Sequence, residues 1–203
     1  MKELKSRSRL FAEAPALFLG RLGLSPNALT VVGSLLTACV GLLIAQGWFV
    51  AAGLCLWLFS ATDTLDGALA RATNRVTVFG AFLDSVCDRY AEAAVFLGLV
   101  WWYQTHADLL GVSLAYLALV GSFMVSYARA RAEGVGLQAA DVGWFQRPER
   151  IIVLGFGLIL AQFLPRALIA CLAILAALTT LTVLQRVRHV ARGTRYNHPH
   201  TTP

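Results

Sequence analysis

Apolar residues fill six long stretches of the chain, and polar or charged positions bound each stretch. A helix needs about 20 mostly apolar residues to cross the hydrocarbon core of a bilayer. We therefore predict an all-α fold, an integral membrane bundle of six transmembrane helices, with spans near Ala28–Trp48, Ala51–Ala70, Val78–Tyr103, Leu109–Ala130, Ile151–Leu164 and Arg166–Val187. The fifth stretch is short, and its helix is expected to begin nearer Gly143.

The segment before the first stretch, residues 1–25, mixes leucine and phenylalanine with charged residues such as Arg9, Glu13 and Arg21. This mixture predicts an amphipathic juxtamembrane helix that lies in the membrane interface. Residues 26–190 form the predicted six-span domain, and residues 191–203 form a polar C-terminal tail. No internal repeat, second domain or cleavable signal peptide is expected from the pattern.

The composition separates this chain from soluble proteins. Apolar residues make up 58% and charged residues 14%, against roughly 25% charged in a typical soluble chain. The net charge of +6 suits either nucleic acid or a membrane surface. Because the basic residues gather at the ends of apolar stretches, the positive charge favours contact with a membrane surface, and no nucleic-acid partner is expected. The four cysteines lie in apolar stretches without a CxxC spacing, so no disulfide framework is expected.

The basic residues also predict an orientation. With six spans, every Lys and Arg except Arg166 falls on the side that holds both termini. Positively charged loops stay in the cytoplasm. We therefore expect a multi-pass protein of the cell membrane with both termini cytoplasmic.

Four aspartates flank the short connection between the second and third stretches. Asp63 and Asp66 are three residues apart, and Asp84 and Asp88 are four apart, so each pair shares one helix face. A short connection makes the two helices antiparallel neighbours, and the four carboxylates are expected to converge near the cytoplasmic edge. Acids near hydrocarbon are costly without a cation, and an all-oxygen set suits magnesium, manganese or calcium. The alternative is pairing with nearby arginines, namely Arg71, Arg75 and Arg89.

Small residues are interleaved with these acids. Gly67, Ala70 and Gly80 would let a ligand approach the backbone closely, although small residues in membrane helices often serve only packing. Arg71 lies four residues after Gly67 and can bind a phosphate through two N–H groups. The pattern therefore predicts the walls of a nucleotide slot.

Together these residues form the run Asp63-x2-Asp66-Gly67-x2-Ala70-Arg71-x8-Gly80-x3-Asp84-x3-Asp88. The run resembles the CDP-alcohol phosphotransferase (CDP-alcohol phosphatidyltransferase) family at every motif position. The resemblance implies a six-helix membrane enzyme, a homodimer, with its active site facing the cytoplasm. It also implies that Asp63, Asp66, Asp84 and Asp88 bind two Mg²⁺ ions, with Mn²⁺ as an alternative, and that Asp88 acts as the catalytic general base.

The same resemblance implies a set of residues that contact the CDP-lipid. The set is Asn27, Thr30, Asp66, Gly67, Ala70, Arg71, Thr77 and Gly80. For Asn27, Thr30 and Thr77 the alternative role is helix capping.

Four arginines at the predicted cytoplasmic helix ends are candidates for binding the acceptor alcohol of the reaction: Arg129, Arg147, Arg150 and Arg186. Such arginines often only anchor helices at the interface, but a phosphorylated acceptor would need a basic pocket. Their surroundings resemble the phosphatidylinositol phosphate synthase branch of the family. That branch implies transfer of a phosphatidyl group from CDP-diacylglycerol to inositol phosphate, with release of CMP. The alternatives are glycerol 3-phosphate as acceptor, giving phosphatidylglycerophosphate, and, more remotely, a divalent-cation transporter.

Overall fold

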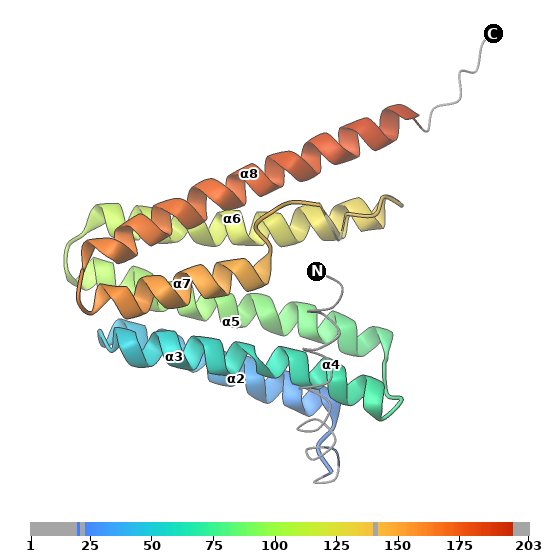
Figure 1. Ribbon diagram of the computed structural model, residues 1–203, viewed down its shortest axis with the longest axis horizontal. Helices are drawn as coiled ribbons and strands as arrows, with labels where there is room; N and C mark the ends of the chain where they lie inside the picture. Colours follow the sequence, from blue (N-terminus) through green and yellow to red (C-terminus); the bar gives the residue numbers. More distant parts are fainter. Residues whose placement is uncertain (1–19, 21–22, 140–141, 197–203) are drawn as a thin grey trace. The chain divides into compact units, whose positions relative to one another are not determined.

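The computed structural model describes Gly20, residues 23–139 and residues 142–196. Within these ranges all regular structure is helical, which confirms the all-α class (Figure 1). The helices are α2 (Pro26–Ala45), α3 (Phe49–Ser60), α4 (Thr62–Ala72), α5 (Val78–Thr105), α6 (Leu109–Gly134), α7 (Arg147–Ala161) and α8 (Arg166–Tyr196). The predicted juxtamembrane helix in residues 1–25 lies almost wholly outside the described residues.

The helix ends differ from the predicted ones for local reasons. The second predicted span is two helices, because the chain is interrupted at Ala61 between α3 and α4. The fifth begins at Arg147 rather than nearer Gly143, because Gln146 caps it: its N–H donates to Glu149 Oε2 at 3.0 Å in a capping box. The sixth continues past Val187 to Tyr196, inside the predicted tail 191–203.

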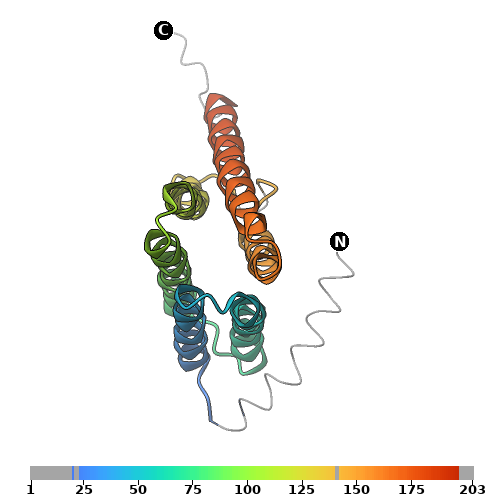
Figure 2. The same cartoon turned by 90° about the vertical axis from the view of Figure 1, so that its left-hand side faces the viewer.

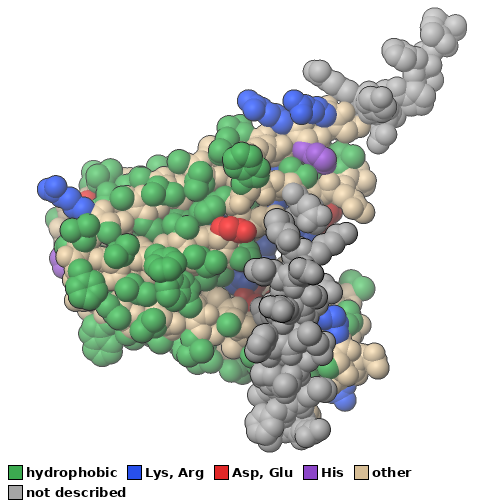
Figure 3. All heavy atoms as spheres, viewed as in Figure 1, with side chains coloured by type: hydrophobic (Ala, Val, Ile, Leu, Met, Phe, Trp, Pro, Cys, Tyr) green, Lys and Arg blue, Asp and Glu red, His purple; other side chains and the backbone are tan. Residues whose placement is uncertain are grey.

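Four helical stretches are long and apolar enough to cross a membrane: Pro26–Ala45, Phe49–Ala72, Leu109–Gly134 and Arg166–Gly193. Two other predicted spans are less apolar or shorter. The first half of α5 carries three charged residues, Asp84, Asp88 and Arg89. Helix α7 has 15 residues, or about 22 Å against a core of roughly 30 Å. Hydrophobic side chains are spread over much of the face in Figure 3, and leucines such as Leu42 and Leu58 are about two thirds exposed. Apolar surface on this scale suits lipid rather than water.

The first of two compact units ends at Trp102 and holds α2, α3, α4 and most of α5. Helix α2 packs against both α3 and α4, as Figures 1 and 2 show. Its contact with α5 is close, since a Cβ atom at Gly41 would collide with the carbonyl of Ala94. This packing holds the first turns of α2 beside α4 and the start of α5.

The second unit begins at Tyr103 and holds α6, α7 and α8. Helix α8 packs against both α6 and α7. Gly121 of α6 lies directly against Thr179 of α8, where a Cβ atom would collide with the threonine hydroxyl. Small residues at such crossings let membrane helices approach closely.

Candidate functional site

A cavity of about 300 Å³ opens in the first unit, between the start of α2, the second half of α4 and the start of α5. All eight residues of the predicted CDP-lipid set line it: Asn27, Thr30, Asp66, Gly67, Ala70, Arg71, Thr77 and Gly80. The remaining lining residues are Pro26, Arg75, Val76, Ala81 and Asp84. Residues spread over more than 50 positions of sequence thus surround a single space.

Thr30 and Asp66 form the most buried polar contact of the cavity. The Thr30 hydroxyl donates to Asp66 Oδ2 at 2.6 Å, and both side chains are buried. The hydroxyl is also 3.1 Å from the Pro26 carbonyl, but its one hydrogen favours the shorter contact with a charged acceptor. Thr30 therefore fixes the orientation of the Asp66 carboxylate.

Helix capping accounts for Thr77 more directly than for Asn27. Thr77 Oγ1 accepts from the Gly80 N–H at 2.9 Å, at the beginning of α5. In α2 the capping residue is Ser25, whose Oγ accepts from Ala28 N at 3.2 Å. The Asn27 side chain lies against Gly80 instead, since an added Cβ there would sit 3.1 Å from Asn27 Oδ1.

Gly67 makes room for the guanidinium of Arg71. A Cβ atom at Gly67 would lie 3.3 Å from Arg71 Nη1. Arg71 stands in the last turn of α4, where a positive charge also complements the helix dipole. The absence of a side chain at position 67 thus lets a cation lie over the helix, at the cavity wall.

The four aspartates do not share the same surroundings. Asp66 and Asp84 line the cavity, and Asp66 experiences the negative charges of Asp84 and Asp63. Asp88 is buried one turn further along α5, and its Oδ2 is 3.5 Å from Nη1 of Arg89. Pairing with arginine, the alternative for these acids, thus applies to Asp88.

The acidic groups suit a hard divalent cation by type, because every candidate donor is a carboxylate oxygen. They do not form a closed cage: within the described residues, no three His, Cys, Asp or Glu side chains lie close enough together to hold a metal ion. Asp66 and Asp84 face the same cavity, so two carboxylates from different helices are available at its wall.

Three of the four predicted acceptor arginines come together in the second unit. Arg186 experiences the positive charges of Arg129 and Arg150. Arg186 and Arg150 are buried, at 2% and 3% exposure, while Arg129 is exposed and pairs with Glu133 Oε1 at 2.9 Å. Arg147, the first residue of α7, is half-buried. Like charges held this close favour the binding of an anion.

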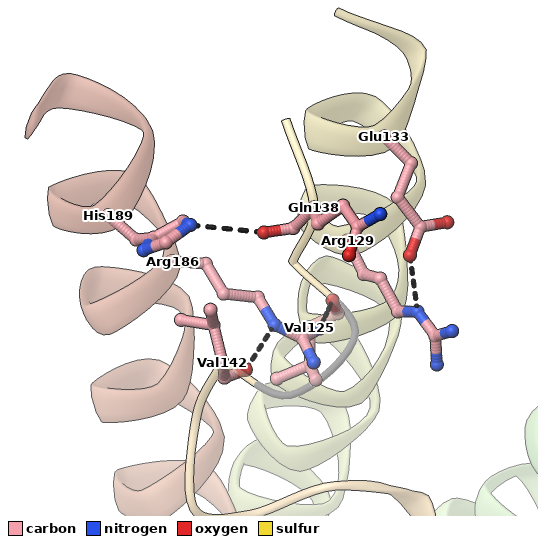
Figure 4. Close-up of polar contacts among 7 residues, drawn as sticks. All are labelled: Val125, Arg129, Glu133, Gln138, Val142, Arg186 and His189. Carbon is pink, nitrogen blue, oxygen red and sulfur yellow. Dashed lines mark hydrogen bonds and ion pairs between the residues drawn. The ribbon is translucent and has the colours of Figure 1, made fainter. Parts of the chain in front are cut away.

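Arg186 also has a role that the sequence did not indicate. Its Nε donates to the Val142 carbonyl at 2.9 Å, and its Nη1 donates to the Val125 carbonyl (Figure 4). One turn further along α8, His189 Nε2 lies 3.0 Å from the Gln138 carbonyl. Both residues therefore attach α8 to the connection between α6 and α7.

The cavity has one charged wall residue that sequence reasoning considered only as a counter-charge for the aspartates. This residue is Arg75, which follows α4 and lines the cavity together with Val76 and Ala81. The available signal was the Asn74 before it, because asparagine just past a helix end often adopts the left-handed conformation that turns the chain.

Similarity to known proteins covers most of the chain. Residues 23–186 match the model of the CDP-alcohol phosphatidyltransferase family. Phosphatidylinositol phosphate synthase of Mycobacteroides abscessus is 42% identical over 141 residues, which cover 68% of this chain and 64% of that protein. The chain thus spans a little less than two thirds of that relative's length. Archaetidylinositol phosphate synthase of Pyrococcus horikoshii is 40% identical over 136 residues, covering 67% of this chain and 70% of that protein.

The fold is also similar to that of solved structures. Crystal structures of Mycobacterium tuberculosis phosphatidylinositol phosphate synthase superpose with TM-scores of 0.82, for the protein with CDP-DAG bound, and 0.83, for its complex with manganese and citrate. The first is 37% identical and covers 88% of this chain and 92% of that chain. The second is 35% identical and covers 95% and 92%.

Proposed function

The chain belongs to the CDP-alcohol phosphatidyltransferase family, and from this membership we propose that it transfers the phosphatidyl group of CDP-diacylglycerol to inositol phosphate. The products are phosphatidylinositol phosphate and CMP. The observation that carries the proposal is the cavity of the first unit, which all eight residues predicted to contact a CDP-lipid line together.

The donor would bind with its diphosphate beside α4. Gly67 leaves space over the helix, and the Arg71 guanidinium above it offers N–H groups to a phosphate oxygen. Asn27 and Thr77 frame the opposite wall near Gly80. The acyl tails would remain in the bilayer, and the exposed leucines of α2 and α3 would face the same lipid.

The aspartates would hold divalent metal, Mg²⁺ or Mn²⁺, and we propose two ions on Asp63, Asp66, Asp84 and Asp88. The manganese in the structure of the tuberculosis relative supports a metal of this type. Bound there, the metal supplies neutralisation of the diphosphate charge. Thr30 would keep the Asp66 carboxylate in one orientation for this purpose.

The chemical step exchanges one phosphorus–oxygen bond for another. The acceptor hydroxyl oxygen attacks the lipid-side phosphorus, the bond from that phosphorus to the CMP oxygen breaks, and CMP leaves with the electron pair. The Asp88 carboxylate would take the proton of the attacking hydroxyl, as a general base must. Its burial beside Arg89 keeps the carboxylate in place within the membrane helix.

The arginines of the second unit would bind the phosphate of the acceptor. Arg186 already experiences the positive charges of Arg129 and Arg150, and an anion bound beside it would relieve this repulsion. Arg147 would add a fourth cation at the start of α7. Unphosphorylated inositol would leave these charges unmatched, which favours the phosphorylated acceptor.

The protein would act as a homodimer with six spans, both termini and the active site on the cytoplasmic side. The near exclusive placement of Lys and Arg on one side of a six-span arrangement supports this topology. A cytoplasmic site also lets CMP and the acceptor, both soluble in water, exchange with a lipid held in the bilayer.

The experiment is CMP release by the purified protein in lipid, with CDP-diacylglycerol and Mg²⁺. Four acceptors are supplied in turn: inositol phosphate, glycerol 3-phosphate, inositol and serine. We expect release with inositol phosphate alone, and none from the Asp88→Asn variant, which keeps the shape of the side chain but not its basicity.

Release with glycerol 3-phosphate instead would reassign the acceptor and keep the reaction class. If no acceptor releases CMP from the wild-type protein, the transferase assignment is wrong, and uptake of Mn²⁺ into sealed vesicles becomes the test of a transporter.

A further inference from the structure

We propose that Arg75 is a second phosphate-binding cation of the cavity, aimed at the diphosphate by the turn that ends α4. The inference rests on the proposed function, because it concerns the same nucleotide-lipid donor. It adds a residue that is not one of the fixed motif positions in the run from Asp63 to Asp88.

The turn after α4 has the geometry that reverses a chain at a helix end. Asn74 has a φ of 54°, in the left-handed region. Its N–H donates to the Arg71 carbonyl at 3.2 Å, and the Arg75 N–H donates to the Ala70 carbonyl at 2.8 Å. This pair of bonds is the Schellman motif, in which the residue after the left-handed position folds back beside the last helical turn. The backbone of Arg75 is thereby held against α4.

That fold-back sets the direction from which Arg75 reaches the cavity. On a continuous helix Arg75 would lie one turn beyond Arg71, but α4 ends at Ala72. Arg71 therefore approaches from the last turn of the helix, and Arg75 approaches from the connection to α5. Both line the cavity together with the acids Asp66 and Asp84.

Charge accounts for the need for a second cation. The four charges of the two proposed divalent ions match the four aspartates that would hold them, so the two negative charges of a CDP-lipid diphosphate, one on each phosphorus, remain for cationic side chains. One guanidinium can bind one phosphate through two N–H groups. A second guanidinium from a different direction lets each phosphate have its own partner.

The test compares nucleotides that differ in phosphate number. Binding of cytidine, CMP and CDP is measured by calorimetry on the full-length protein in lipid nanodiscs with Mg²⁺, for wild type, Arg75→Gln and Arg75→Lys. We expect Arg75→Gln to raise the Kd of CDP by about tenfold or more, the effect of one charge-assisted hydrogen bond. We expect the Kd of cytidine to stay unchanged and Arg75→Lys to recover part of the loss.

Arg188→Gln is the matched control, because it removes one exposed arginine from the last turns of α8, outside the cavity. It should leave the Kd of CDP at the wild-type value. Since Arg75 is exposed, the difference between wild type and Arg75→Gln should also shrink as salt concentration rises. An unchanged Kd of CDP in Arg75→Gln, or an equal loss for cytidine, would overturn the inference.

The role of the turn is tested separately. Asn74→Gly keeps access to a positive φ and should bind CDP as wild type does, whereas Asn74→Val disfavours that φ and should lose CDP affinity as Arg75→Gln does. Equal affinity in both variants would refute the part assigned to the turn. Transfer activity of the wild type, measured on the same preparation, separates the two claims: CDP binding that depends on Arg75 without any transfer would contradict the proposed function only.

Discussion

At the scale of single residues, the Thr30 hydroxyl is the group that orients the Asp66 carboxylate, at 2.6 Å. Thr30→Val keeps the shape and removes the hydrogen bond, whereas Thr30→Ser keeps the hydroxyl. Removing a group that orients a metal ligand typically lowers the affinity for the metal 10- to 100-fold. We predict that Thr30→Val weakens Mn²⁺ binding, followed by electron paramagnetic resonance, by about tenfold, and that Thr30→Ser binds nearly as wild type. Equal Mn²⁺ affinity in all three proteins would show that Thr30 has no such role.

Arg186 combines a structural role with its proposed role in acceptor binding. Its two bonds to the carbonyls of Val125 and Val142 use two of the five N–H groups of a guanidinium. We predict that Arg186→Ala lowers the stability of the folded protein by roughly 2 to 4 kcal/mol, because two acceptors lose their donor at a buried position. Thermal unfolding in detergent measures this loss, with the exposed Arg188→Ala as control. A melting temperature equal to wild type would mean that other groups hold this connection in place.

At the scale of helices, the contact between α2 and α5 depends on the absence of side chains. A Cβ atom at Gly41 would meet backbone atoms of Ala94, which cannot move as a flexible side chain can. We predict that Gly41→Leu lowers the free energy of unfolding by about 1 to 3 kcal/mol, the usual cost of overpacking. Gly134→Ala is the matched control, since nothing lies within 4 Å of its added Cβ. A similar melting temperature for Gly41→Leu and Gly134→Ala would refute the close contact.

The helices themselves could be predicted from apolar length, but several of their ends could not. Hydropathy does not reveal the Gln146–Glu149 capping box that begins α7. It also does not reveal the interruption at Ala61, because the average over the whole stretch is apolar enough for one continuous span. The helical conformation of α8 beyond Val187 was missed because that segment is polar. Polar residues end a membrane span, yet they do not end a helix that continues into water.

The candidate site shows the same division between pattern and geometry. The cavity residues of α4 and α5 were predictable, because fixed spacing on helices fixes which side chains share a face. Arg75 was missed as a cavity residue because its position depends on one left-handed residue, Asn74. The backbone bonds of Arg186 were missed because Val125 and Val142 are far from it in sequence.

At the scale of the whole molecule, the six-span arrangement makes a prediction about sidedness. Helices α5 and α7 are the two whose crossing is least evident from length and apolar content. If both cross, His106 and Arg166 lie outside, and Gln138 lies in the cytoplasm. We predict that a membrane-impermeant maleimide labels single cysteines at 106 and 166 on intact cells, in a variant without the four native cysteines. A cysteine at 138 should react only after the membrane is opened.

Labelling of position 138 on intact cells, or protection of position 106, would remove one span from the arrangement and place α5 or α7 differently. The Lys and Arg residues would then no longer lie almost all on the cytoplasmic side of the membrane.

The central claim is that the phosphatidyl group moves intact from CDP-diacylglycerol to inositol phosphate. The most direct measurement uses CDP-diacylglycerol carrying ³²P in its lipid-side phosphate, incubated with the purified protein, Mg²⁺ and inositol phosphate. We predict that the label appears in phosphatidylinositol phosphate, in an amount equal to the unlabelled CMP released, and that removal of the metal with EDTA stops both. Label in the released nucleotide, or CMP release with no labelled inositol lipid, would contradict the account.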